Sequence, residues 1–243
     1  MDYTKLQNGS DIRGVAMEGI EGQHVNLTEQ ACRDIGRGFA LWLRARLGKD
    51  TLRVAVGRDS RLSGPQLALW LMEAMAAEGL QVTDLGMAST PAMFMSTVMP
   101  VYQFDGAIMI TASHLPWNRN GFKFFTAEGG LEKADIQAIL KRASTIYPIA
   151  EHYECEENEL MDMYAAHLRS IITRKVGGKL DGMKITVDAG NGAGTAGSGC
   201  FFQPVPGAGR SLPESRAESG KPGGHGVHLR TGAGSRCGSG NYF

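Results

Sequence analysis

The chain has 243 residues, and its 25 basic and 25 acidic side chains give a formal net charge of zero. This balance gives no reason to expect nucleic acid or an anionic membrane as a partner. The polar start has no apolar targeting segment, and no run of about 18 apolar residues could span a bilayer. The four cysteines form no CxxC pair, so we expect neither a zinc site nor a disulfide framework, but a soluble cytoplasmic protein.

The first part of the chain alternates helix and strand patterns, which predicts a mixed α/β sheet with helices on both faces. Apolar residues at helical spacing predict a core-facing helix over residues 28–47. After a strand over residues 52–56, Ser63 as N-cap and Pro65 in the first turn open a second helix. Gly79 is expected to end it.

The same patterns predict the remaining elements of this region. We expect strands over residues 80–85, 106–110 and 122–125, and helices over residues 91–99 and 132–146. Within this region, Met93, Met95 and Met99 are interpreted as adaptable packing rather than as a metal or cofactor site.

Residues 1–148 are expected to form the first domain, and residues 149–194 a linker helix with the start of a second α/β domain. His152 and Cys155 lie near glutamates, which could suggest a metal site, but a solvated linker is the favoured interpretation. Residues 195–243 contain no Asp, Ile or Met and are rich in Gly, Pro and Ser. Such a tract cannot bury enough apolar surface to offset the entropy of ordering it, so we expect a disordered, largely unstructured tail.

The bias of this tail toward Gly, Ala, Arg, Pro and Ser is what GC-rich DNA yields out of frame. We therefore hypothesise that the residues after about Gly194 come from a shifted reading frame or a truncated gene. Reading the other two frames of the gene would test this hypothesis.

The most informative stretch is residues 111–123, TASHLPWNRNGFK, which follow the apolar strand at 106–110. The Asn120-Gly121 pair is a turn signal, so Ser113 is expected in a polar loop behind a buried strand. In open α/β sheets, ligands collect outside the carboxyl ends of the strands. The loop is therefore a suitable position for a ligand-binding or catalytic site.

A serine hydroxyl needs a base to become a nucleophile, and a phosphorylated serine needs cations that offset the charge on the transferring oxygens. His114 and Lys123 are nearby candidates for these roles. The alternative is that Ser113 caps a turn, His114 is a surface imidazole and Lys123 is solvated. Spacing alone favours this alternative.

The string TASHLPWNRNGFK resembles the phosphoserine loop of the alpha-D-phosphohexomutases, the family of phosphomannomutase and phosphoglucomutase, whose usual string is TASHNPxxxNGxK. Three further motifs fit in the same order: DIRG at residues 11–14, VGRDSR at 56–61, and the strand at 182–188 followed by AGNGAG. Alone, DIRG could be a strand end with a surface arginine, and GRDSR a turn with an exposed ion pair. Leu115 departs from the usual asparagine and removes a loop amide.

By this resemblance, Ser113 would carry the phosphoryl group and, as phosphoserine, provide one ligand of Mg²⁺. Lys123 would be the general acid or base near the sugar hydroxyl, and Arg13 would supply positive charge. His114 would orient or stabilise the serine loop. The residues that would support the site or shape the neighbouring loops are Arg58, Asp59, Asn120 and Gly121.

The resemblance implies an intramolecular phosphotransferase that interconverts hexose 1-phosphate and hexose 6-phosphate through a bisphosphosugar, with Mg²⁺ as cofactor and hexose 1,6-bisphosphate as activator. The DGDxDR string, whose aspartates hold magnesium in the family, does not occur, and the family's third and fourth domains have no counterpart. A catalytically silent phosphate-binding fragment is therefore an alternative, as is the phosphoglucosamine mutase branch. Neither the sugar nor the oligomeric state follows from the sequence.

A different class of function rests on Gly192, Gly194 and Gly197, which form GxGxxG just after a predicted strand and mimic a dinucleotide fingerprint. The segment that should open a helix instead contains Pro204 and Pro206. No second strand ends in an acidic residue about 20 positions further on. A glycine-rich turn is the favoured interpretation.

Overall fold

The computed structural model describes residues 2–145, 156–177, 183–187 and 227–231. The chain divides into two compact units, Met1–Met161 and Asp162–Phe243. The domain limits predicted from the sequence, at residues 148 and 194, stay predictions.

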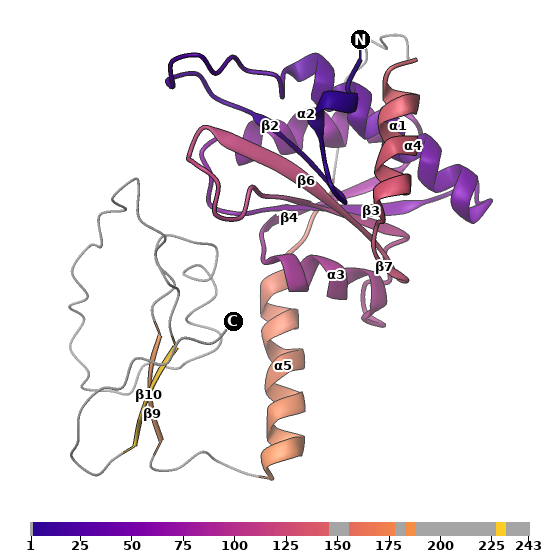
Figure 1. The fold of residues 1–243 in the computed structure, drawn as a ribbon. Helices are drawn as coiled ribbons and strands as arrows, with labels where there is room; N and C mark the ends of the chain where they lie inside the picture. Colours follow the sequence, from indigo (N-terminus) through magenta and orange to yellow (C-terminus); the bar gives the residue numbers. More distant parts are fainter. Residues whose placement is uncertain (1, 146–155, 178–182, 188–226, 232–243) are drawn as a thin grey trace. The chain divides into compact units, whose positions relative to one another are not determined.

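The first unit contains the large sheet and its covering helices (Figure 1). Its elements are, in chain order, a 3-10 helix (Thr4–Leu6), β1 (Gln7–Asn8), β2 (Asp11–Val15), α1 (Glu29–Leu47), β3 (Arg53–Arg58), α2 (Gly64–Ala77), β4 (Gln81–Met87), α3 (Thr90–Val98), β5 (Gly106–Ile110), β6 (Arg119–Thr126), β7 (Gly129–Gly130), α4 (Lys133–Ala143) and β8 (Glu156–Glu157).

The strands are ordered β1-β2-β6-β5-β3-β4-β8, with β7 paired to β6. Strand β3 runs parallel to β4 and β5, whereas β6 runs antiparallel to β2 and β5. The sheet is therefore mixed, as predicted. Because β6 lies between β2 and β5, the loop that joins β5 to β6 lies close to residues of β2.

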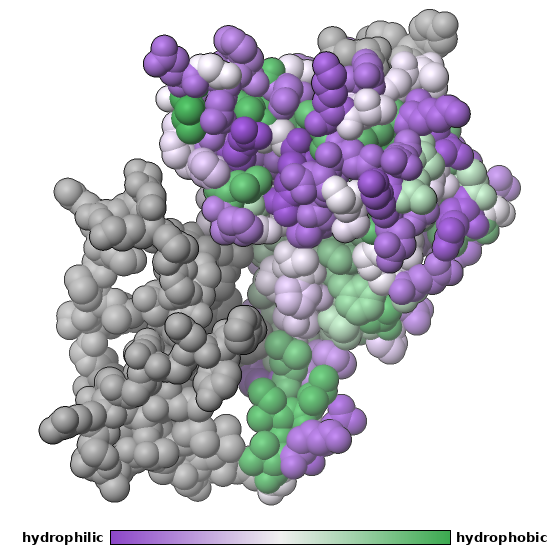
Figure 2. Space-filling model, in the orientation of Figure 1, coloured by the Kyte–Doolittle hydropathy of each residue, from purple (hydrophilic) through white to green (hydrophobic). Residues whose placement is uncertain are grey.

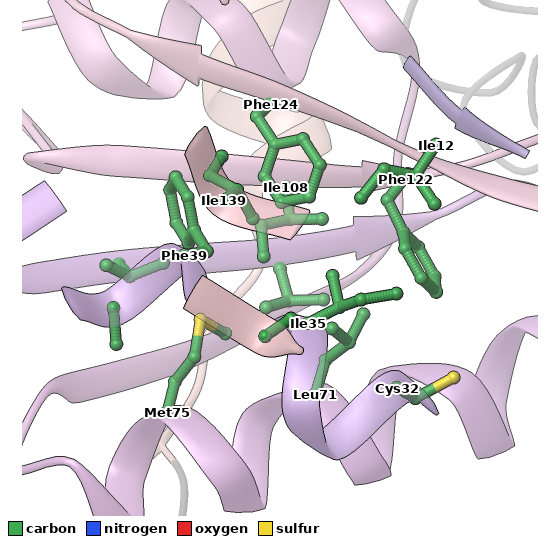
Figure 3. Close-up of a cluster of buried hydrophobic side chains, with 14 of the residues drawn as sticks. Ile12, Cys32, Ile35, Phe39, Leu71, Met75, Ile108, Phe122, Phe124 and Ile139 are labelled. Atoms are coloured by element: carbon green, nitrogen blue, oxygen red, sulfur yellow. The ribbon is translucent and has the colours of Figure 1, made fainter. Parts of the chain in front are cut away.

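Helices α1, α2 and α4 cover one face of the sheet and α3 covers the other, which confirms the predicted helices on both faces (Figure 1). The main core lies between the sheet and helices α1, α2 and α4. Figure 3 shows its central side chains, which include Ile12, Ile35, Phe39, Leu71, Met75, Ile108, Phe122, Phe124 and Ile139. Full burial of each such side chain stabilises the fold by about 1.5–3 kcal/mol. On the other face, Met93 of α3 is fully buried and Met99 nearly so, which supports their interpretation as packing residues.

Both termini of helix α1 are capped. The Thr28 hydroxyl accepts a hydrogen bond from the Ala31 N–H, and Gly48 ends the helix in the left-handed conformation at φ 62°. Ser63 is the N-cap residue of α2, as predicted, but its side chain makes no capping hydrogen bond. Its Oγ instead accepts a hydrogen bond from Asn120 Nδ2 at 2.9 Å.

Several predicted segment ends differ from the structure by one to three residues, and two of the differences have a clear cause. Helix α4 ends at Ala143 rather than at residue 146, where the Ser144 hydroxyl donates to the Leu140 carbonyl. Strand β6 begins at Arg119 rather than at residue 122, because its first residues pair with β2. The strand therefore takes in Asn120 and Gly121, which the sequence predicted to form a turn.

The described parts of the second unit are most of α5 (Leu160–Val176), β9 (Met183–Val187) and β10 (Val227–Thr231). Strands β9 and β10 pair antiparallel, with Leu229 opposite Ile185. Strand β10 is the described part of the tail that was predicted to be largely unstructured, and its apolar and polar residues alternate as in a strand. The rest of the tail lies outside the described residues, as do His152, Cys155 and the glycines of the GxGxxG string.

Figure 2 shows apolar side chains gathered along α5. The exposed ones in this helix are Met163, Ile171, Ile172 and Val176. Among the described residues, no helix combines the length and the apolar character that crossing a membrane requires.

Candidate active site

Ser113 lies just beyond the carboxyl end of β5, as the sequence predicts, and is exposed. Its φ of 55° is left-handed, a conformation that costs a non-glycine residue about 1–2 kcal/mol. The Ser113 N–H donates to Thr111 Oγ1 at 3.0 Å, and the Leu115 N–H donates to the Ala112 carbonyl at 3.1 Å. Hydrogen bonds within the loop therefore stabilise an unfavourable conformation at its serine.

Asp59 joins the end of β3 to the serine loop. Its Oδ2 accepts a hydrogen bond from the Thr111 hydroxyl at 2.7 Å, and its N–H donates to the Ile110 carbonyl at 3.0 Å. Asp59 therefore contacts the serine loop, and the supporting role predicted for it stays a prediction. The carboxyl ends of the parallel strands β3 and β5 are thus held together at the site.

Arg61 reaches the same loop from the segment between β3 and α2, and the sequence did not single it out. Its two terminal nitrogens donate hydrogen bonds to carbonyl oxygens at 2.8–3.0 Å, those of Ser113, Leu115, Pro116 and Arg119. Its side chain is only 14% exposed, and this burial lowers the pKa of Arg61. The second arginine of GRDSR was the sequence signal that could have identified it.

Arg13 brings positive charge to the serine. Its Nη2 lies 3.3 Å from Ser113 Oγ and 2.8 Å from Asp11 Oδ2, while its Nη1 donates to the Thr111 carbonyl at 3.0 Å. Lys123 Nζ donates to the same Asp11 oxygen at 2.6 Å. The structure thus brings Arg13 and Ser113 together, and it links Arg13 to Lys123 through Asp11, a residue that the sequence analysis did not select.

Asn120 and Gly121 lie in β6 next to β2. Asn120 Oδ1 accepts a hydrogen bond from the Gly121 N–H at 2.9 Å. A Cβ at Gly121 would lie 2.2 Å from the Ile12 carbonyl oxygen and 2.6 Å from Arg13 Cδ. Only glycine therefore lets β2 approach closely enough to place Arg13 beside the loop.

Among the described residues, neither the side chain of His114 nor that of Arg58 makes a hydrogen bond with Ser113. His114 is exposed and makes no hydrogen bond to any residue in the described ranges. Arg58 forms an ion pair with Asp84 on β4, with Nη1 2.8 Å from Oδ1 and 3.0 Å from Oδ2. The roles predicted for both residues stay predictions.

The described residues do not fit a magnesium site. Among them, no group of three His, Cys, Asp or Glu side chains could hold a metal ion. Asp11, the carboxylate that Arg13 connects to Ser113, already accepts from two cationic side chains. Mg²⁺ prefers several oxygen ligands, whereas the guanidinium of Arg13 beside Ser113 favours the binding of an anion.

An exposed hydroxyl beside a guanidinium, with an ammonium in the same network, can hold a phosphoryl group. Residues 4–149 match the family model described as phosphoglucomutase/phosphomannomutase, alpha/beta/alpha domain I. The chain belongs to this family. The resemblance that the serine loop suggested is therefore confirmed for the N-terminal part of the chain.

Two relatives that match the chain carry different names. A phosphomannomutase/phosphoglucomutase of Pseudomonas syringae is 32% identical over 190 residues, which cover 75% of this chain and 36% of that protein. A phosphoglucosamine mutase of Corynebacterium glutamicum is 33% identical over 200 residues, which cover 78% of this chain and 42% of that protein. The chain thus spans well under half the length of these relatives.

Solved structures of the family agree with the fold. A phosphoglucomutase/phosphomannomutase family protein from Burkholderia thailandensis superimposes with a TM-score of 0.60 at 29% identity, covering 83% of this chain and 43% of that one. The Paramecium phosphoglucomutase parafusin gives a TM-score of 0.62 at 15% identity and covers 81% of this chain and 40% of that one. At that identity, the second likeness supports the fold alone.

Proposed function

We propose that Ser113 is the phosphoryl carrier of a phosphohexomutase reaction, in which a hexose 1-phosphate and a hexose 6-phosphate are interconverted through a bisphosphosugar. The observation that carries this proposal is the 3.3 Å contact between Arg13 Nη2 and Ser113 Oγ. A phosphoserine brings a charge of about −1.5 to −2 near neutral pH, which a guanidinium at this distance offsets.

In the donor step, the bond between phosphorus and Ser113 Oγ breaks as a sugar hydroxyl oxygen bonds to the same phosphorus. Arg13 stabilises the negative charge on the transferring oxygens. Lys123 is proposed as the general acid or base that exchanges a proton with the sugar hydroxyl. The reverse transfer returns the other phosphoryl group of the bisphosphosugar to Ser113 and completes the interconversion.

A second candidate is a phosphate-binding chain that takes up a phosphoryl group without turnover. The observation that favours it is that the described residues do not fit a magnesium site. Since relatives of both names match the chain, glucose, mannose and glucosamine phosphates are all substrates to test.

The test begins with the intact mass of the full chain after incubation with glucose 1,6-bisphosphate and Mg²⁺. A gain of one phosphoryl group, mapped to Ser113 and absent from Ser113→Ala, is expected. Ser170→Ala, which removes an exposed hydroxyl on α5, is the matched control and should be phosphorylated normally. A wild-type chain that takes up no phosphoryl group would contradict the proposal.

Mutase assays on the three hexose 1-phosphates then separate the two candidates. Turnover that Ser113→Ala abolishes supports the mutase. Phosphorylation of Ser113 without turnover of any of these sugars supports the phosphate-binding chain instead.

A further inference from the structure

Both terminal nitrogens of Arg61 donate hydrogen bonds to backbone carbonyls of residues 113–119. Nη2 donates to the carbonyls of Ser113 at 2.9 Å and Leu115 at 2.8 Å. Nη1 donates to the carbonyls of Pro116 at 2.8 Å and Arg119 at 3.0 Å. Each terminal nitrogen has two hydrogens, so these bonds occupy every terminal N–H of the side chain.

The remaining nitrogen of Arg61 is also directed away from solvent. Nε is buried, makes no hydrogen bond, and lies 3.4 Å from Asp59 Oδ2. An arginine beside a phosphoryl carrier would ordinarily be interpreted as a phosphate ligand. Arg61 has no terminal N–H left for that role, whereas Arg13 directs Nη2 at Ser113 Oγ.

One of the four carbonyls belongs to Ser113 itself. Arg61 therefore holds the peptide after Ser113, while Thr111 Oγ1 holds the peptide before it by accepting from the Ser113 N–H. Both peptides around the left-handed φ of 55° are thus fixed, and with them the direction in which the Ser113 side chain leaves the backbone.

We propose that Arg61 is a positioning residue that keeps Ser113 left-handed and its Oγ facing Arg13, and that it acts through geometry rather than by neutralising phosphate charge. Lysine cannot replace it, because the three N–H donors of an ammonium are on one nitrogen and cannot reach four separate carbonyl oxygens. The proposal rests on phosphoryl transfer at Ser113.

The test compares Arg61→Lys and Arg61→Ala with the wild-type chain in the mutase assay. A displaced serine is expected to lower kcat by about 100-fold in both variants, with KM for the hexose phosphate changed less than about twofold. Added methylguanidine should restore part of kcat in Arg61→Ala and none in Arg61→Lys. Arg46→Lys, a change at an exposed ion pair with Glu128, is the matched control and should behave as wild type.

A charge-neutralising Arg61 would give a different pattern. Arg61→Lys would then keep most of the wild-type kcat, and Arg61→Ala would raise KM for the phosphorylated sugar. Either result would overturn the positioning role.

Amide hydrogen exchange tests the geometry without any activity. In Arg61→Lys, peptides covering residues 113–119 should exchange at least tenfold faster than in the wild type, while those of the β5 strand stay protected. Unchanged exchange in the loop would refute the inference. If the wild type takes up no phosphoryl group, the proposed function fails, and exchange in the loop still decides whether Arg61 holds it.

Discussion

Lys123 and Asp11 face each other across the paired strands β6 and β2, with Nζ 2.6 Å from Oδ2. The same carboxylate oxygen accepts a hydrogen bond from Arg13 at 2.8 Å. One acidic side chain therefore sets the positions of the two cations that are proposed to act at Ser113. The negative charge of Asp11 offsets one of the two positive charges, so Asp11, Arg13 and Lys123 together carry a single net positive charge.

Removal of the Asp11 charge should separate binding from transfer. In Asp11→Asn, Arg13 and Lys123 lose their shared partner, so phosphoryl uptake at Ser113 should slow by roughly 10–100-fold. Binding of inorganic phosphate should not weaken, because the site gains a net positive charge. Intact mass against time measures the first effect and titration calorimetry the second. Asp50→Asn, at an exposed aspartate, is the control, and an uptake rate in Asp11→Asn equal to the wild-type rate would contradict the prediction.

A side chain at Gly121 should disrupt the contact between β2 and β6. In Gly121→Ala the new Cβ would overlap the Ile12 carbonyl, so we expect a loss of about 3 kcal/mol in the free energy of unfolding. Gly64→Ala is the control, since its Cβ would meet Arg58 and Asp59 at 3.5–3.6 Å, ordinary contact distances. Urea unfolding followed by tryptophan fluorescence measures both variants. Equal stability of the two would show that the strands can separate at little cost.

The hydrogen bond between Asn120 and Ser63 should be measurable as a coupling energy. Ser63→Ala leaves the buried Asn120 amide without this partner, which should cost about 1–3 kcal/mol. In a double-mutant cycle with Asn120→Ala, the coupling should be about 1 kcal/mol or more. Ser89→Ala removes a helix cap on α3 instead and should show no coupling to Asn120. Additive effects of Ser63→Ala and Asn120→Ala would argue against the bond.

Tyr3 should make the stability of the chain depend on alkaline pH. Burial and a 2.6 Å hydrogen bond to Asp34 raise the pKa of Tyr3 well above its ordinary value. Since the unfolded phenol titrates near pH 10, the stabilisation is complete below that pH and is lost as the pH rises further. Tyr3→Phe should therefore be about 1–2 kcal/mol less stable than wild type at pH 8, and the difference should shrink by pH 11. Urea unfolding at both pH values measures it, and a difference that does not change with pH would contradict the prediction.

The sequence predicted those features that depend on local pattern. Helix α1 has a strong apolar periodicity, and it lies within residues 28–47, where it was expected. Strand β5 occupies Gly106–Ile110, the predicted range, because a short apolar run bounded by polar residues has few other conformations open to it. The predicted position of Ser113, just beyond the end of this strand, follows from the position of the strand.

Features that depend on pairing between distant segments were missed. Asn120-Gly121 is a local turn signal, yet pairing with β2 makes it part of a strand. Ser63 is a favourable N-cap residue, yet its hydroxyl accepts a hydrogen bond from Asn120 instead of capping the helix. Asp11 and Arg61 were not selected, because their roles come from the register of β2 against β6 and from loop carbonyls that no sequence motif marks.

The position of β6 between β5 and β2 also affects the order in which the site can assemble. Strands β5 and β6 form a hairpin, so the serine loop needs only local chain closure. The contacts that Arg13 makes with Thr111 and Ser113 join residues 98 and 100 positions apart, and that of Lys123 with Asp11 spans 112. Contacts this distant in sequence carry the largest closure entropy and form more slowly than a hairpin. A partly folded chain therefore presents the serine without its cations, so the phosphoryl transfer proposed for Ser113 requires the native state.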